Sequence, residues 1–167
     1  SKIIHSKPYL NVVDDVSKMP GAKWFSGAKL NFAENLLRFR DKRPAIHFKR
    51  EGKTVITYSY RVVYDEVEKV THALRTLGVV KGDRVVGFIP NIPESIIAML
   101  ATASIGAIWS SSSPDFGTKA VLDRFAQIEP KVIFAADGYF YNGKSYDSIK
   151  KLKEISINIP ALQKVVI

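Results

Sequence analysis

The fold is decided by residues 77–89, which read Leu77-Gly78-Val79-Val80-Lys81-Gly82-Asp83-Arg84-Val85-Val86-Gly87-Phe88-Ile89. A helix is predicted to end at Gly78, because glycine readily adopts the left-handed conformation that stops a helix. Residues 81–83 are typical of a tight turn. The run from Val85 to Ile89 does not alternate with polar residues, so it predicts a strand covered on both faces. This stretch therefore indicates a helix leading into the buried strand of an α/β layer.

The same pattern recurs on either side of this stretch. Apolar residues at steps of four, three, four and three predict an amphipathic helix over residues 60–77. Its apolar face consists of Val63, Val67, Val70, Leu74 and Leu77. Further helices are predicted over 93–106, 118–128 and 148–155, and further strands over 108–111, 131–135 and from 165 onward. Strands that alternate with helices through short loops run parallel, joined by right-handed crossovers. The expected fold class is α/β, with a doubly wound, mostly parallel sheet.

Two smaller pieces precede this layer. Residues 44–50 and 54–58 alternate apolar and polar side chains around the turn Glu51-Gly52-Lys53, which predicts a small β-hairpin. Residues 1–43 lack a clean period and are expected to form an N-terminal arm. Within this arm a short helix is predicted over residues 30–37, with Asn31 as its cap.

The net charge of +9 is concentrated at the two ends of the chain. Residues 1–50 hold 11 Lys/Arg against 4 Asp/Glu, residues 51–130 hold 8 against 9, and residues 131–167 hold 6 against 3, giving +7, −1 and +3. The basic residues are scattered among Pro, Gly and apolar positions rather than grouped with groove-reading elements, which argues against nucleic acid as a partner. A polyanionic small substrate such as ATP or CoA would be attracted by the same field. A nucleic-acid-binding domain remains an alternative that rests on the charge alone.

Composition excludes several kinds of site. The chain has no cysteine, so it forms no disulfide and carries no cysteine nucleophile. The histidines are far apart and show no metal-ligand spacing, so no metal site is expected. No apolar run reaches the length of a membrane helix, and no membrane partner is expected. These features are compatible with a cytoplasmic protein.

Four stretches, in this order and spacing, resemble the adenylate-forming (AMP-binding) superfamily. They are the segments at 24–37, 57–85, 90–94 and 106–117, and they include Trp24-Phe25-Ser26-Gly27, Gly82-Asp83-Arg84-Val85, Pro90-Asn91-Ile92-Pro93-Glu94 and Ser113-Pro114-Asp115-Phe116-Gly117. The first resembles short-chain acyl-CoA synthetases. The turn at 113–117 looks like acetoacetyl-CoA synthetases rather than acetyl-CoA synthetases. The resemblance covers roughly residues 20–136.

This resemblance implies the function of an acid–thiol ligase, an acetoacetate–CoA ligase. Such an enzyme uses ATP and Mg²⁺ to convert a short-chain carboxylate, here acetoacetate, into an acyl-adenylate, and then transfers the acyl group to CoA. Residues 1–43 correspond to the arm of the short-chain synthetases and residues 44–167 to the first part of the AMP-binding domain, an incomplete N-terminal subdomain. The superfamily's Ser/Thr/Gly-rich phosphate loop ending in Pro-Lys is absent from the sequence. The 167-residue chain is therefore expected to be a fragment that is inactive alone, binds no ATP, Mg²⁺ or CoA by itself, and requires the remainder of the enzyme.

No catalytic residue is assigned, and the candidate binding residues lie on the CoA side. The resemblance places CoA contacts at Ser113, Pro114, Asp115, Phe116, Gly117 and Lys144, with Phe116 stacking on adenine and Lys144 pairing with a phosphate. Both segments follow predicted central strands, whose carboxyl ends form the ligand-binding edge of such a sheet. Tyr141 stands where an arginine is common in the superfamily, and this departure weakens the assignment. A core role for Phe116 and a surface hairpin without a ligand around Lys144 are the competing interpretations.

Other polar clusters favour structural roles. Gly78, Gly82 and Asp83 suit turns. The run Ser110–Ser113 lacks a following lysine and is expected to satisfy local backbone groups rather than hold a phosphate. Asp65, Glu66 and Glu68 lie on the polar face of the helix over 60–77. A non-catalytic binding or assembly module built on the same scaffold remains the alternative function.

Overall fold

A parallel sheet forms the centre of the computed structural model, which describes residues 3–167. Within these residues the sheet has four strands in the order β10-β7-β5-β6, every neighbouring pair parallel. The strands are β5 (Arg84–Phe88), β6 (Ile108–Ser112), β7 (Val132–Ala135) and β10 (Lys164–Val166). All four lie where the sequence predicts strands. Val85 and Val86 are both fully buried, as expected for a strand covered on its two faces.

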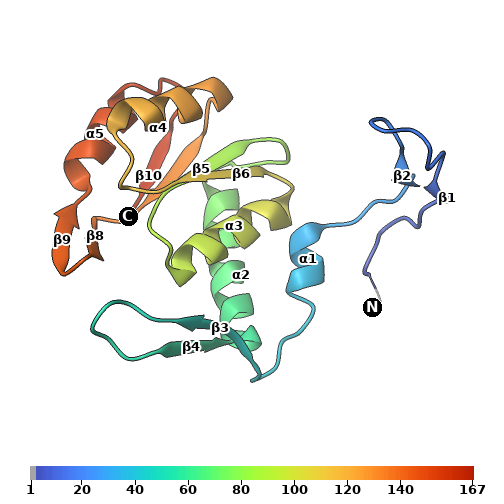
Figure 1. The fold of residues 1–167 in the computed structure, drawn as a ribbon, viewed down its shortest axis with the longest axis horizontal. Helices are drawn as coiled ribbons and strands as arrows, with labels where there is room; N and C mark the ends of the chain where they lie inside the picture. Colours follow the sequence, from blue (N-terminus) through green and yellow to red (C-terminus); the bar gives the residue numbers. More distant parts are fainter. Residues whose placement is uncertain (1–2) are drawn as a thin grey trace.

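Helices cover both faces of the sheet, so the predicted doubly wound fold is confirmed (Figure 1). One face packs against α2 (Tyr60–Thr76) and α3 (Pro93–Ile105). The other face packs against α4 (Thr118–Phe125), its 3-10 extension η1 (Ala126–Ile128) and α5 (Ile149–Ile157). Neighbouring residues of a strand point to opposite faces. Val85 accordingly joins the core under α2 and α3, whereas Val86 and Phe88 join the core under α4 and α5.

Three two-stranded hairpins lie outside the central sheet among the described residues. They are β1 (Asn11–Val13) with β2 (Trp24–Ser26), β3 (Pro44–Phe48) with β4 (Ile56–Ser59), and β8 (Gly138–Tyr141) with β9 (Lys144–Asp147). All three pairs are antiparallel. The β3–β4 hairpin was predicted from its alternation. In Figure 1 the β1–β2 hairpin stands apart from the α/β layer.

The short helix α1 (Phe32–Leu36) connects the N-terminal segment to the layer. Asn31 caps it as predicted, because its side-chain oxygen accepts a hydrogen bond from the Glu34 amide at 3.1 Å. The amide nitrogen of the same Asn31 side chain donates to the carbonyls of Ala103 and Ser104 at the end of α3. One side chain therefore both starts α1 and fixes it to α3.

Hydrogen bonds made by Asp83 and Lys131 join the segments at the amino-terminal edge of the sheet. Asp83 accepts a hydrogen bond from the Val80 amide at 2.8 Å and one from Lys131 Nζ at 3.1 Å. Lys131 Nζ also donates to the carbonyl of Gly78, whose φ of +75° ends the preceding helix. The hydrogen bond from the Val80 amide lowers the pKa of Asp83 below its usual value, and the hydrogen bond and positive charge of Lys131 lower it further. These contacts confirm the structural role predicted for Gly78 and Asp83.

Gly87 in β5 lets the indole of Trp109 lie directly against the strand. A Cβ atom added at Gly87 would lie 2.7 Å from Cζ2 and 2.8 Å from Cη2 of Trp109. The indole comes from the neighbouring strand β6, where Trp109 is paired with Val85. It packs in the core under α2 and α3. This position therefore requires a residue without a side chain.

We expect Gly87→Ala to lower the free energy of unfolding by about 1–3 kcal/mol, the usual cost of forcing an additional methyl group into a packed core. Urea unfolding followed by circular dichroism measures the change. Gly117→Ala is the matched control, because Gly117 has a φ of −68° and a Cβ there meets open space. Equal stability of the two variants would contradict the close contact with Trp109.

Candidate functional site

The carboxyl ends of three central strands meet at one edge of the sheet and form the floor of a cavity of about 620 Å³. Residues that follow β5, β6 and β7 line it, together with residues from two hairpins. These are Pro90, Asn91 and Ile92 after β5, Ser113 and Asp115 after β6, Ala136 and Asp137 after β7, Phe48 to Glu51 from the β3–β4 hairpin, and Gly138 to Tyr141 of β8. Ligands of open α/β sheets bind at this edge.

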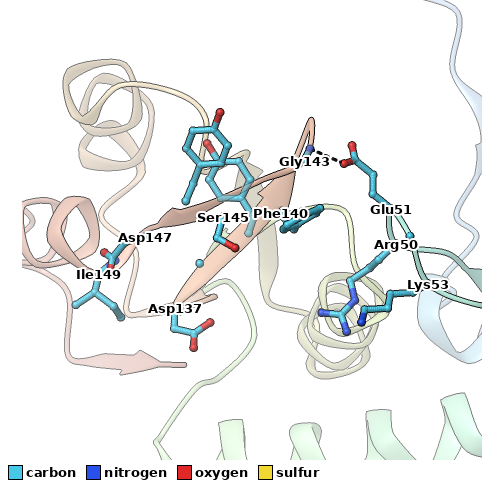
Figure 2. Close-up of a pocket in the computed structure, with 13 residues that line it drawn as sticks. Arg50, Glu51, Lys53, Asp137, Phe140, Gly143, Ser145, Asp147 and Ile149 are labelled. Atoms are coloured by element: carbon cyan, nitrogen blue, oxygen red, sulfur yellow. Dashed lines mark hydrogen bonds between the residues drawn. The ribbon is translucent and has the colours of Figure 1, made fainter.

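A second, larger cavity of about 1070 Å³ lies between the β3–β4 hairpin and the β8–β9 hairpin (Figure 2). One wall consists of Arg50 to Lys53, and the other of residues from Asp137 to Ile149. Both cavities share Arg50, Glu51 and residues 137–140 as lining. They are therefore two parts of one hollow over the carboxyl edge of the sheet.

The predicted turn at 113–117 borders this hollow, and its members differ in exposure. Ser113 and Asp115 are exposed and line the smaller cavity, whereas Pro114 is buried beneath the turn. Phe116 is 42% exposed, so a purely core role for this ring is wrong. Gly117 is the N-cap residue of α4.

Two cations fix the conformation of this turn. Lys151 of α5 donates from Nζ to the carbonyl of Pro114 at 2.9 Å and to that of Phe116 at 3.3 Å. The guanidinium of Arg124 lies over one face of the Phe116 ring, 4.8 Å from its centroid. A planar ligand would therefore stack on the opposite face of Phe116.

The segment around Lys144 is a surface hairpin with a two-residue turn. Asn142 and Gly143 have φ values of +48° and +72°, and Tyr141 pairs with Lys144 beside them. Lys144 is exposed and is not among the residues that line either cavity, although its neighbours Gly143 and Ser145 line the larger one. The structure therefore brings Ser113 and Asp115 to the hollow, whereas Pro114, Phe116, Gly117 and Lys144 line neither cavity.

Aromatic side chains of the same hairpin line the larger cavity. Tyr139 and Tyr146 stack across the two strands, with ring centroids 5.1 Å apart and planes 13° from parallel. Burial raises the pKa of the Tyr139 hydroxyl, and the negative charge of Asp115 raises it further. Phe140 adds a ring that is 48% exposed. These rings offer flat apolar surface beside the polar end of the sheet.

Sequence reasoning missed the contribution of the β3–β4 turn. The Glu51 carboxylate accepts hydrogen bonds from the amides of Asn142 and Gly143, at 3.0 and 3.1 Å. The sequence predicts an ordinary turn at Glu51-Gly52-Lys53, and nothing in it signals a contact with a turn some 90 residues later. The acid nevertheless fastens one wall of the hollow to the other.

The serine run behaves differently from its expected structural role in one respect. Ser112 is buried, and its Oγ has no hydrogen-bond partner within residues 3–167. The expectation that its hydroxyl satisfies local backbone is therefore wrong. Ser112 pairs with Phe88 in the sheet and so faces the apolar layer under α4 and α5, where polar partners are scarce.

Metal-binding clusters and membrane-spanning helices are both absent from the described residues. Among the described residues no group of three or more His, Asp or Glu side chains is placed to hold a metal ion. Within residues 3–167 no helix combines the length and the apolar character that a bilayer crossing requires.

Comparison with known proteins places this geometry in context. The model of a family described as AMP-binding enzyme matches residues 32–167. Acetoacetyl-CoA synthetase of Macaca fascicularis is 46% identical over 172 residues, which are 100% of this chain and 25% of that protein. Acetoacetyl-coenzyme A synthetase of Rhizobium meliloti (strain 1021) is 48% identical over 151 residues, 88% of this chain and 23% of that protein.

A solved structure shows the same similarity in three dimensions. The acetoacetyl-CoA synthetase from Streptomyces lividans superimposes with a TM-score of 0.90 at 42% identity, covering 98% of this chain and 26% of that chain. The chain thus spans about a quarter of the length of the relatives that it matches.

Proposed function

The chain belongs to the AMP-binding enzyme family, and we propose that the whole protein is a cytoplasmic acid–thiol ligase that converts acetoacetate to its CoA thioester. In the first step a carboxylate oxygen attacks the α-phosphorus of ATP, and pyrophosphate leaves. In the second step the CoA thiol attacks the acyl carbonyl of the adenylate, and AMP leaves. Similarity along the whole chain to acetoacetyl-CoA synthetases supports this choice of acid.

The part of this reaction assigned to the present chain is the recognition of CoA. The observation that carries the assignment is the hollow at the carboxyl edge of the sheet, bordered by the turn at 113–117 and by the aromatic β8–β9 hairpin. Its exposed rings suit a base. The partly exposed Phe116 belongs to the bordering turn but lines neither cavity. In this proposal Phe116 stacks on the adenine of CoA, and Lys144 approaches a phosphate from the rim.

The adenylate-forming step is not assigned to residues of this chain. The sequence contains no Ser/Thr/Gly-rich loop that ends in Pro-Lys. The described residues also offer no cluster that fits Mg²⁺, so no Mg²⁺ ligand is assigned and no step is derived through the ion. We propose residues 1–43 as an arm and residues 44–167 as the CoA-side part of the adenylate-forming domain.

The whole protein, incubated with acetoacetate, ATP, Mg²⁺ and CoA, is expected to release AMP and form acetoacetyl-CoA in equal amounts. Acetate is the control acid and should react more slowly, because a site that hydrogen-bonds a second carbonyl disfavours a substrate lacking one. The 167-residue chain alone should give neither product. A whole protein that prefers acetate would overturn the choice of acetoacetate as the substrate. Turnover by the 167-residue chain would overturn the assignment of adenylate formation to the rest of the protein.

A further inference from the structure

The β3–β4 turn presents two cations to the larger cavity without partners of their own. Arg50 and Lys53 line it, and no other Lys or Arg does so among the described residues. Both are exposed, and neither forms an ion pair within residues 3–167. In Figure 2 their head groups extend into the open space under Phe140, while Glu51 extends the other way, toward Gly143. The turn therefore directs its positive charge into the cavity.

Glu51 holds this turn in place. The two-residue turn Asn142-Gly143 leaves its amides outside the β8–β9 ladder, so they can donate to another segment. The Glu51 carboxylate accepts from both, in hydrogen bonds of 3.0 and 3.1 Å. Charge-assisted bonds of this kind are stronger than neutral ones. Glu51 thus holds the turn that carries Arg50 and Lys53 against the β8–β9 hairpin. Both of its carboxylate oxygens already accept hydrogen bonds.

The lining of this cavity holds two cations, Arg50 and Lys53, and three carboxylates, Glu51, Asp137 and Asp147, so its formal charge is −1, and both cations stand on the β3–β4 turn. Asp147 is engaged by the first turn of α5, because its Oδ1 accepts from the Ile149 amide at 2.8 Å. Asp137 has no described side-chain hydrogen bond, so the placement of Arg50 and Lys53 on one turn, and not the net charge of the lining, is what favours an anion beside them. Phe140, a ring that is 48% exposed, lies on the same side of the β8–β9 hairpin as the two cations (Figure 2). Two cations beside the exposed ring of Phe140 fit a ligand that carries both a base and phosphate groups.

We propose that Arg50 and Lys53 bind a phosphate group of the CoA nucleotide, and that Glu51 is the positioning residue that fastens their turn across the cavity. This inference rests on the proposed function and extends it. It moves the main phosphate contact from the rim at Lys144 to the β3–β4 turn, on the opposite side of the hollow. Arg50 supplies a planar fork and Lys53 a point charge, so the two are not interchangeable.

The test uses the whole protein with Arg50→Ala, Lys53→Ala and the double variant. Each single variant is expected to raise the KM for CoA about tenfold, the factor that corresponds to loss of one charge-assisted hydrogen bond. The kcat should change little. Acetoacetate-dependent exchange of pyrophosphate into ATP, which needs no CoA, should stay at the wild-type rate. Lys81→Ala, which removes one exposed positive charge at the opposite edge of the sheet, is the matched control and should leave KM unchanged.

The positioning role of Glu51 is tested in two backgrounds. Glu51→Ala should raise the KM for CoA in the wild-type background and add little in the double Arg50→Ala, Lys53→Ala background, because coupled residues are not additive. An equal effect in both backgrounds would contradict positioning through the cations.

Three outcomes separate this inference from the function on which it rests. An unchanged KM for CoA in the double variant, with normal pyrophosphate exchange, would overturn the phosphate site and leave the proposed function standing. A parallel loss of exchange and of CoA-dependent turnover would show a general structural role and also overturn it. Absence of acetoacetate-dependent exchange in the wild-type whole protein would overturn the proposed function itself, and the inference with it.

Discussion

Phe88→Ala is expected to lower the free energy of unfolding by about 3–5 kcal/mol, the range found when a large aromatic side chain is removed from a packed core. Phe88 is fully buried at the end of β5. It packs in the core under α4 and α5 with Val121 and Phe125, which are also fully buried. The loss is a large fraction of the roughly 5–15 kcal/mol that stabilises a typical domain. Because β5 leads directly to Pro90 at the cavity floor, this core also supports the candidate site.

Urea unfolding followed by circular dichroism measures the effect of Phe88→Ala. Phe140→Ala is the matched control, because the same side chain is removed from an exposed position on β8, where surface changes cost about 0.5 kcal/mol or less. A loss below about 1 kcal/mol for Phe88→Ala, or equal losses for both variants, would contradict the account of the core under α4 and α5.

The central layer was predictable because its side chains follow strong local patterns. The apolar face of α2 repeats at helical spacing, and Val63, Val67 and Leu74 are indeed buried. The uninterrupted apolar run of β5 indicated burial on both faces, and the structure shows it. Asn31 was recognisable as a cap, because an amide side chain just before a helix can accept a hydrogen bond from the first free backbone N–H groups.

The composition of the site was less predictable because it depends on contacts between distant turns. Glu51 and Gly143 are 92 residues apart, and each turn is complete without the other. The Asn142-Gly143 pair did carry a local signal, since this dipeptide favours two-residue hairpin turns. Using that signal would have paired Tyr141 with Lys144 and placed Lys144 beside the turn, as the structure shows.

The proposed CoA side makes a second prediction with a large effect, at Phe116. Phe116→Ala in the whole protein is expected to raise the KM for CoA about five- to hundredfold, because stacking of a base on an aromatic ring contributes about 1–3 kcal/mol. Lys144→Ala should raise it less, because an ion pair made by an exposed side chain contributes only about 0–1 kcal/mol. Phe32→Ala, which removes a ring that is 57% exposed on α1, is the control and should have no effect on CoA.

The most direct measurement compares the two half-reactions of Phe116→Ala in the whole protein. Pyrophosphate exchange reports formation of the adenylate, and release of acetoacetyl-CoA at varied CoA concentration reports the thioester step. If CoA binds at the carboxyl edge of this sheet, Phe116→Ala will show near-normal pyrophosphate exchange together with a raised KM for CoA. Equal loss in both half-reactions, or no change in either, would contradict it.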